Sequence, residues 1–544
     1  MTKANALTGL FDAVVFDLAR QMRWSFLPPL MIYFAAGCSG LTLIVGTFFV
    51  KDYLDLTAAE VAALAFWAGL PWALKMPLGH LVDIVWRYKG WLVWLGAGLI
   101  ALSVGIMYLV MTGPAMMETV MPLRAWYVTS YLIAPCGLVI QDAVADAMSV
   151  EAVPTTDAQG VPLPEADTKA MHTTMQTLGR FSLISGTVVV ALINIAMFSG
   201  VETLGDAGKN TIYARIYLIG MLIPLLSVSG VLLATTQRAR RVARMVASGL
   251  DRATARASVT PDSPATTPNY WYFIGGAGFV AMSLTVGLGQ IAYGQEIIFA
   301  GSMAIVLLLM RQLIRALSPA QARALVGTAL IIFVFRMVPL PGEGLKWFEI
   351  DVLEFDQQFL SVLSLITSVL TLVGLVALRP MMARRPITWI VVVLTLIAGL
   401  LSLPNIGLYY GIHNWTAGIT GGIVDARFIA ILDTAAESPL GQVAMIPMLA
   451  WIARNAPMHL KATFFAVMAS FTNLALSAAA LLTRYLNQIF EITREVRDGA
   501  TGAVLTAADY SQLGWLLLAV AALTVGLPLI VVMLVQRSRL RSTD

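Results

Sequence analysis

Charged side chains are scarce in this sequence. Asp, Glu, Lys and Arg make up only 12% of the 544 residues, whereas hydrophobic residues make up 58%. A soluble domain carries about 25% charged residues, so the composition excludes a soluble globular protein and predicts an all-α polytopic membrane protein. The net charge is +4, but the basic residues occur in short clusters between apolar runs, so no nucleic-acid partner is expected.

The residues that build catalytic and metal sites are equally few. Both cysteines, Cys38 and Cys136, lie inside apolar runs, and the four histidines are scattered along the chain. This pattern indicates neither a disulfide nor a metal site. The sequence also has no Gly-rich phosphate loop, no nucleophile elbow and no zinc-ligand spacing. We therefore predict that the protein is not an enzyme and binds no cofactor.

Long apolar runs follow one another along the whole chain. Taking about 20 apolar residues as one membrane span, the sequence predicts fourteen spans. The segment before them lacks the basic-then-apolar order of a signal peptide. The predicted spans run roughly over 28–50, 59–83, 91–112, 124–147, 170–199, 212–235, 271–290, 295–315, 322–341, 357–378, 387–408, 427–452, 460–488 and 512–536.

The basic residues orient these spans. With the N-terminus inside, 23 of the 35 Lys and Arg residues fall on the cytoplasmic side and 8 fall outside. This bias predicts that both termini are cytoplasmic. The other four lie within predicted spans and are Lys75, Arg180, Arg336 and Arg484.

The largest change in composition separates the sixth and seventh spans. The segment starts with the basic run Gln237–Met245 and ends in Ser, Thr and Pro. It predicts a basic amphipathic helix on the inner leaflet followed by a flexible linker, with docking of a partner as the alternative. Transporters built from two six-helix halves usually bind their substrate at the interface between the halves. The predicted parts are an N-terminal segment (1–27), a six-helix half (28–235), a basic linker (236–268), an inserted two-helix hairpin (269–316), a second six-helix half (317–536) and a basic tail (537–544).

Lys75 is an unusual residue for a membrane span. It lies between Pro71 and Pro77 in the second span, and an ionisable group there costs roughly 2.5–3.5 kcal/mol. It is therefore expected to face protein or water. Asp83 lies near the same helix face, about 12 Å further along the axis.

The fourth span ends in three acidic residues. Asp142 and Asp146 lie four residues apart on one helix face, and Glu151 follows at the cytoplasmic boundary. The predicted depth of Asp142, about 13 Å from the inner surface, is close to that of Lys75. The two could form a structural ion pair, or they could belong to a gate or a proton site.

Arg180 occupies the middle of the fifth span. Its planar group of donors suits a carboxylate, which could be Asp142 or an anionic substrate. Asn473 occupies the corresponding place in the thirteenth span. This asymmetry suggests that the N-terminal half binds the charged end of a substrate, although Arg180 could instead only neutralise an aspartate.

Asp433 and Glu437 lie four residues apart in the outer half of the twelfth span. Arg336 is predicted in the same outer layer. These three residues suit an extracellular gate or a proton entry point.

Two short motifs in the N-terminal half resemble those of a known family. The run Gly69–Gly79 (Gly-Leu-Pro-Trp-Ala-Leu-Lys-Met-Pro-Leu-Gly) resembles the Pro-Trp-x-x-Lys-Pro-Leu-x-Gly signature of the folate–biopterin transporter family, a branch of the major facilitator superfamily. Asp83, Arg87 and Lys89 resemble the superfamily's loop between helices two and three, which latches the inward gate. The Asp142, Asp146 and Glu151 spacing also resembles the family's helix four.

The C-terminal half resembles the same family. The runs Gly441–Leu449 and Thr463–Asn473 are similar to its Gly-Gln-x-x-x-x-Pro and Phe-Ala-x-x-x-Ser-x-x-Asn stretches. However, Met76 and Lys461 depart from the family pattern, and the family usually has twelve helices. Muropeptide permeases, which resemble the fourth span too, have fourteen.

The resemblance implies a major-facilitator-like fold. Together with the six-two-six layout, it predicts a monomeric secondary active transporter that works by alternating access. The transporter is expected to be a proton-coupled symporter for an organic anion such as folate or a pterin. The predicted location is a bacterial inner membrane. A permease for muropeptides or another metabolite is the first alternative. A non-transporting scaffold or receptor is the second, although it has no need of charges within its spans.

Overall fold

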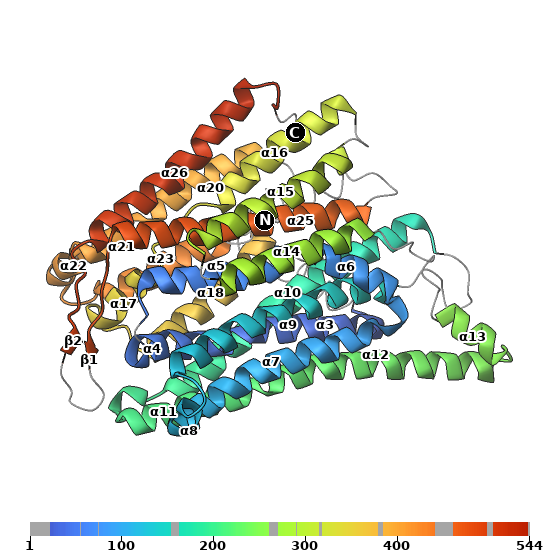
Figure 1. Ribbon diagram of the computed structural model, residues 1–544, viewed down its shortest axis with the longest axis horizontal. Helices are drawn as coiled ribbons and strands as arrows, with labels where there is room; N and C mark the ends of the chain where they lie inside the picture. Colours follow the sequence, from blue (N-terminus) through green and yellow to red (C-terminus); the bar gives the residue numbers. More distant parts are fainter. Residues whose placement is uncertain are drawn as a thin grey trace, which may run out of the picture. The chain divides into compact units, whose positions relative to one another are not determined.

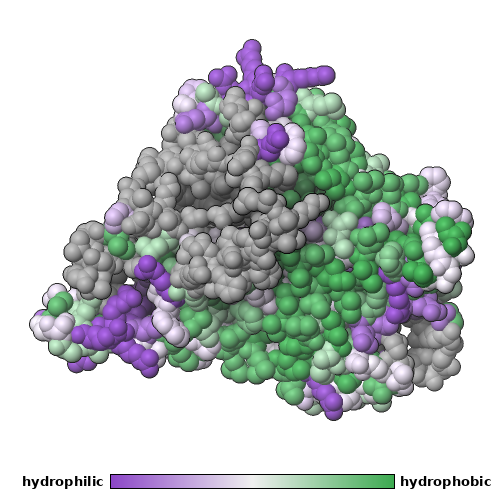
Figure 2. Space-filling model, turned by 180° about the vertical axis from the view of Figure 1, so that it is seen from behind, coloured by the Kyte–Doolittle hydropathy of each residue, from purple (hydrophilic) through white to green (hydrophobic). Residues whose placement is uncertain are grey.

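The computed structural model is almost entirely helical, as the composition predicts. It describes residues 22–54, 56–73, 75–153, 163–259, 270–289, 291–314, 318–378, 385–440, 461–497 and 504–541. Within these ranges, ten helical segments are long and apolar enough to cross a membrane. Hydrophobic side chains cover much of the described surface that is visible in Figure 2, and hydrophilic ones gather toward its edges.

The chain divides into two compact units. Unit 1 comprises residues 1–42, 77–197 and 204–270, and unit 2 comprises residues 43–76, 198–203 and 271–544. The helices of unit 1 are η2 (Trp24–Phe26), α3 (Leu27–Cys38), η3 (Ser39–Thr42), α6 (Lys75–Ile84, from its third residue), η4 (Trp86–Tyr88), α7 (Lys89–Thr112), α8 (Pro114–Glu118), α9 (Leu123–Ala152), α10 (Glu165–Phe198), α11 (Asp206–Gly220), α12 (Leu222–Ala247) and α13 (Arg252–Val259).

Unit 2 contains the C-terminal part of the chain together with a short N-terminal piece. Its elements are α4 (Leu43–Tyr53), α5 (Ala58–Ala73), η5 (Val201–Thr203), α14 (Tyr270–Leu288), α15 (Gly294–Ile314), α16 (Pro319–Arg336), α17 (Glu343–Asp351), α18 (Gln357–Ala377), α20 (Ile387–Leu401), α21 (Leu403–Tyr409), α22 (Ile412–Thr420), α23 (Ala426–Glu437), η6 (Ser438–Leu440), α25 (Lys461–Ile489), β1 (Val496–Arg497), β2 (Val504–Thr506) and α26 (Leu513–Arg537).

Small residues allow the helices of unit 1 to pack closely. A Cβ on Gly96 of α7 would lie 2.6 Å from the carbonyl oxygen of Gly137 on α9, and one on Gly137 would lie 2.5 Å from that of Gly96. Two glycines at one crossing let the backbones of membrane helices approach directly. The neighbouring helices α3, α7, α9 and α12 lie side by side in Figure 1.

Buried polar side chains add hydrogen bonds between these helices. Ser103 of α7 donates to the carbonyl oxygen of Ser130 on α9 at 2.8 Å. The Gln141 amide donates to the Val93 carbonyl at 3.3 Å and accepts from the Ser227 hydroxyl at 3.0 Å, which joins α9 to α7 and α12. Hydrogen bonds of this kind fix the rotation of each helix about its axis, whereas apolar packing alone would allow several rotations.

Helix α12 extends beyond the predicted end of the sixth span. It continues without interruption from the sixth predicted span through the basic run to Ala247, and α13 follows (Figure 1). Arg, Ala and Met have high helix propensity, so the helix does not stop where the apolar run stops. The basic run is therefore an extension of a spanning helix.

In unit 2, the first half of the second predicted span packs against α25. A Cβ on Gly69 of α5 would lie 3.3 Å from the Ser477 hydroxyl of α25. Phe66 and Leu70 of α5 join Leu481 of α25 and Ile298 of α15 in one buried cluster. The structure describes α5 up to Ala73 and α6 from Lys75, and a single apolar span runs across both from Ala58 to Val82.

Hydrogen bonds and ion pairs also tie the short N-terminal piece to the rest of unit 2. The buried guanidinium of Arg494 donates to the carbonyl oxygens of Lys51 and Leu54 at the end of α4. The Lys51 ammonium lies 2.7 Å from the Asp351 carboxylate of α17. The small antiparallel ribbon β1–β2, which the sequence did not predict, follows Arg494 directly.

Candidate functional site

Asp146 is fixed by a hydroxyl group from another helix. The Tyr33 hydroxyl of α3 donates to Asp146 Oδ1 of α9 at 2.7 Å, although 113 residues separate them in the chain. Tyr33 is buried, and its ring packs with Val144 and Met148 of α9 in the main core cluster of unit 1. A hydrogen bond from another helix therefore holds the Asp146 carboxyl group in position.

The Tyr33 ring also contacts the fifth span. A Cβ on Gly179 of α10 would lie 3.0 Å from the ring, so only glycine leaves room for it. Arg180 follows Gly179 and is half-buried, as is Asp142, one turn before Asp146. Within the described part of the chain no ion pair joins Arg180 to Asp142, so that pairing stays a prediction.

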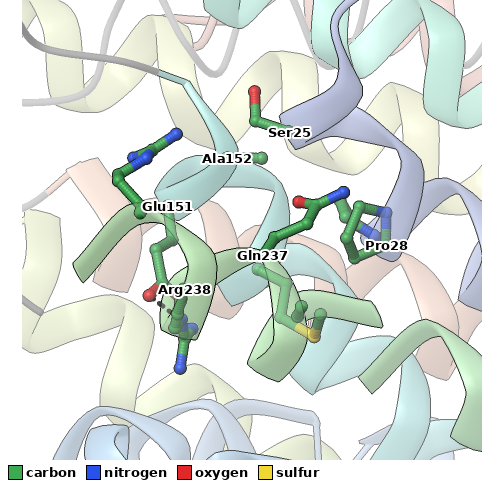
Figure 3. A pocket seen from close by; sticks show the side chains of 10 residues that line it. Ser25, Pro28, Glu151, Ala152, Gln237 and Arg238 are labelled. Carbon is green, nitrogen blue, oxygen red and sulfur yellow. Dashed lines mark hydrogen bonds and ion pairs between the residues drawn. The ribbon is translucent and has the colours of Figure 1, made fainter. Parts of the chain in front are cut away.

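Three charged residues meet at the end of the same helices. The Lys89 ammonium of α7 lies 2.6 Å from Glu151 Oε2 of α9. Arg238 of α12 lies 2.5 Å from Glu151 Oε1, a contact that Figure 3 shows. The Lys89 side chain is only 4% exposed, and its ammonium also lies 3.6 Å from the centre of the Trp86 ring. We call Lys89, Glu151 and Arg238 the ionic triad.

A small cavity of about 80 Å³ lies beside the ionic triad. Glu151, Arg238 and Gln237 line it on one side and Ser25 and Pro28 on the other (Figure 3). The Gln237 amide donates to the Trp24 carbonyl oxygen at 2.8 Å, which connects α12 to the start of the chain's described part. The polar extension of α12 thus lies against the start of α3.

The predicted gate residues fall into two groups. Lys89 and Glu151 are in direct contact in the structure. Arg87 is exposed in η4, while the side chain of Asp83 lies outside the described residues. The structure therefore joins two of these four residues, and the role of all four as a gate stays a prediction.

Lys75 and Asn473 belong to unit 2. Lys75 begins α6 and Asn473 lies on α25, and both side chains are half-buried. Asp142 and Arg180 belong to unit 1. The pairing of Lys75 with Asp142, and the correspondence of Asn473 with Arg180, stay predictions.

The predicted outer carboxylates have different surroundings. Asp433 of α23 is 9% exposed, and its Oδ2 accepts from the Asn405 amide of α21 at 3.2 Å, whereas its Oδ1 has no partner among the described residues. Glu437, at the end of α23, is exposed. Arg336 is half-buried in the last turn of α16. The pairing of Arg336 with these carboxylates, and with it the outer gate, stays a prediction.

A further carboxyl group lies close to Asp433. Burial raises the pKa of Glu349, on α17 between two spans, to about 7, with Lys346 opposing this shift and Asp433 adding to it. Glu349 gave no sequence signal, because it lies in an ordinary amphipathic turn outside the apolar runs. Its raised pKa results from burial and from Asp433, which lies far away in the sequence.

Sequence reasoning also missed Tyr33 and Arg238. Tyrosine is common in apolar spans, so nothing in the first span marked Tyr33 as a partner of Asp146. Arg238 was counted only as one of several cations in the linker. The helical spacing of the last apolar residues of α12 could have placed Arg238 on the buried face.

Comparison with known proteins finds relatives of this chain. A curated folate-biopterin transporter from a Synechocystis species is 24% identical over 477 residues, which cover 86% of this chain and 76% of that protein. A transporter of the POT family, solved with 5-aminolevulinic acid, superposes with a TM-score of 0.63 at 12% identity, covering 95% of this chain and 96% of that one. The nucleoside transporter NupG gives 0.53 at 12% identity, covering 93% and 98%.

The likeness to these structures shows that the chain has the fold of POT-family transporters, which bears out the predicted major-facilitator-like fold. The count of fourteen spans stays a prediction. A family model matches residues 36–543, nearly the whole chain. The protein is therefore an integral membrane transporter that belongs to the BT1 family.

Proposed function

We propose that this transporter is a proton-coupled symporter that works by alternating access and carries an organic anion such as folate or a pterin. The observation that carries the proposal is the placement of Tyr33, whose hydroxyl bonds Asp146 on α9 and whose ring packs on Gly179, next to Arg180 on α10. The chain thus places acidic and basic side chains on two helices that share one aromatic neighbour.

The two carboxylates on α9 have separable roles in this proposal. Tyr33 holds the Asp146 carboxyl group in position, which suits a fixed charge. Asp142, one turn away, carries the proton, because two like charges on adjacent turns repel and neutralising one relieves the repulsion. Arg180 binds the carboxylate of the substrate, since its planar group of donors can bind both oxygens.

The substrate is tested by uptake into proteoliposomes that contain the purified protein. Labelled folate, biopterin and anhydro-muropeptide are compared, each with and without an inward proton gradient. The proposal expects concentrative uptake of folate or biopterin that needs the gradient. Uptake of the muropeptide alone would favour the permease alternative, and equal uptake with or without the gradient would contradict proton coupling.

The roles of Asp142 and Arg180 are tested by comparing exchange with net uptake. Asp142→Asn is expected to exchange substrate across the membrane while failing to concentrate it, because exchange needs no net protonation cycle. Asp251→Asn, in the exposed stretch between α12 and α13, is the control and should match the unmodified protein. If uptake returns when Asp142→Asn is combined with Arg180→Gln, Asp142 only neutralises Arg180 and carries no proton.

A further inference from the structure

A second and larger cavity lies on the other side of Arg238. It has a volume of about 260 Å³ and lies between the start of α7 and the C-terminal part of α12. Gly90 allows this arrangement, because a Cβ there would lie 3.0 Å from Val231 of α12. We call this cavity the α7–α12 groove, and its lining includes Arg87, Lys89, Trp91, Trp94, Leu232 and Arg238.

The polar end of the groove is positively charged. Arg87 is exposed, and Lys89 and Arg238 both contact the carboxylate of Glu151. Three cations therefore lie at this end of the groove. Helix α7 also starts here, and its N-cap residue Tyr88 offers no side-chain cap, so backbone N–H groups at Gly90 and Trp91 add to the positive potential.

The remainder of the groove is apolar and open to the protein surface. The side chains of Trp91, Trp94 and Leu232 are 73%, 45% and 51% exposed. In a helix that crosses a bilayer, such side chains face lipid. Tryptophan also concentrates at the level of lipid headgroups, where its ring lies in hydrocarbon and its N–H reaches water.

We propose that the α7–α12 groove binds an anionic phospholipid of the inner leaflet. The phosphodiester lies at the start of α7 between Arg87 and Arg238, and the acyl chains run along Trp91, Trp94 and Leu232. Basic pockets between membrane helices on the cytoplasmic side suit anionic headgroups, and the charge bias of the sequence predicts that this end is cytoplasmic. A soluble phosphate would leave the apolar part of the groove unused.

The bound lipid would act on the ionic triad. Arg238 lines the groove and also binds Glu151 at 2.5 Å, so a phosphate in the groove competes for the same guanidinium. Lipid composition would then change the strength of the contact between α12 and α9. This consequence needs no assumption about which substrate the protein carries.

Lipid binding is tested on the purified full chain in detergent. Dioleoyl phosphatidylglycerol, dioleoyl phosphatidylcholine and glycerol 1-phosphate are titrated separately, and bound lipid is counted by native mass spectrometry alongside the thermal midpoint. We expect phosphatidylglycerol to bind at least fivefold more tightly than phosphatidylcholine. Arg87→Gln should weaken phosphatidylglycerol about fivefold, the effect of one cation near an anionic lipid.

Two further variants keep the test decisive. Thr235→Glu places a negative charge at an exposed position of the groove and should weaken phosphatidylglycerol in the same way. Arg240→Gln removes an equivalent charge from an exposed position of α12 outside the groove and should have no effect. Equal binding of the two lipids, an equal loss in Arg240→Gln, or glycerol 1-phosphate binding as tight as phosphatidylglycerol would each overturn the proposal. None of these measurements depends on transport.

Discussion

The Tyr33 hydroxyl is the group that a conservative substitution can remove most cleanly. Tyr33→Phe keeps the ring against Gly179 but leaves Asp146 Oδ1 without its donor at 2.7 Å. A hydrogen bond to a charged group contributes about 1.5–3 kcal/mol, so we expect a lower thermal midpoint and slower concentrative uptake. Tyr270→Phe, at an exposed position of α14, should change neither quantity. Unchanged uptake in Tyr33→Phe would exclude the hydroxyl from the mechanism.

The ionic triad makes a second prediction for single residues. Glu151→Gln removes the anion that lies 2.6 Å from the buried ammonium of Lys89, and breaking a buried pair in this way costs about 3–5 kcal/mol. Arg238 is one-third exposed, so Arg238→Gln should cost much less. Thermal unfolding in detergent compares the two variants.

The control and the rescue for this prediction use the same assay. Glu118→Gln, in the exposed helix α8, should leave the midpoint unchanged. Adding Lys89→Met to Glu151→Gln removes the buried cation and should recover most of the lost thermal midpoint. No recovery would show that Glu151 stabilises the protein through Arg238 or through packing.

At the scale of single elements, helix α17 makes stability depend on pH. Burial raises the pKa of Glu349 from its ordinary value of 4.5 to about 7, so the folded protein binds a proton that the unfolded chain releases. The contribution of Glu349 to stability is therefore most favourable below about pH 4.5 and is lost as the pH rises to about 7. Glu349→Gln should flatten this part of the curve of thermal midpoint against pH. Glu354→Gln, at an exposed position after α17, should keep the slope, and an unchanged slope in Glu349→Gln would contradict the assignment.

The inserted hairpin α14–α15 covers an apolar surface that its removal would expose. Ile298 of α15 packs with Phe66, Leu70 and Leu481, and the Arg484 guanidinium of α25 donates to the Gln295 amide oxygen at 3.0 Å. Replacing residues 270–316 by a linker should lower the thermal midpoint and keep some uptake, since the predicted substrate residues lie elsewhere. Complete loss of uptake at normal expression would show that the hairpin forms part of the pathway.

The interaction of Arg484 with the hairpin can be tested separately. Arg484→Met should lower the midpoint by less than the deletion does, because the apolar contacts remain. Arg311→Met, at an exposed position of α15, is the matched control. Equal effects of Arg484→Met and Arg311→Met would show that the Gln295 contact adds no stability.

For the whole molecule, the orientation in the membrane is open to labelling. In a background with Cys38→Ala and Cys136→Ala, single cysteines at the exposed positions Ala253 and Val352 are treated with an impermeant maleimide. The charge bias predicts that the cysteine at 253 reacts only from inside and the one at 352 only from outside. Labelling of both from one side would show that the predicted number of spans is wrong.

The helices were largely predictable because hydropathy is a local property. The predicted spans 91–112 and 512–536 correspond to α7 (Lys89–Thr112) and α26 (Leu513–Arg537). The count was harder to establish, since four of the fourteen predicted spans are not among the ten apolar segments of the described residues. Each of the four, 271–290, 295–315, 427–452 and 460–488, includes at least one residue that the structure does not describe.

The site was less predictable because its contacts join distant parts of the chain. Spacing along α9 placed Asp142 and Asp146 on one face, but it could not show that Tyr33 lies opposite Asp146. The same limit applies to Arg238, whose contact with Glu151 depends on α12 continuing beyond its apolar run. Periodicity shows which residues share a helix face, whereas tertiary packing decides what that face meets.

The packing of α5 against α25 has a consequence for biosynthesis. All of unit 1 is encoded before residue 271, so it can assemble while the ribosome is still translating. Helix α5 must wait for α25, which begins roughly 390 residues later. At about 5–20 residues per second, translation of that stretch takes roughly 20–80 s. Until then, the side of α5 that later meets Leu481 must be covered by lipid or by the insertion machinery, because α25 has not yet been synthesised.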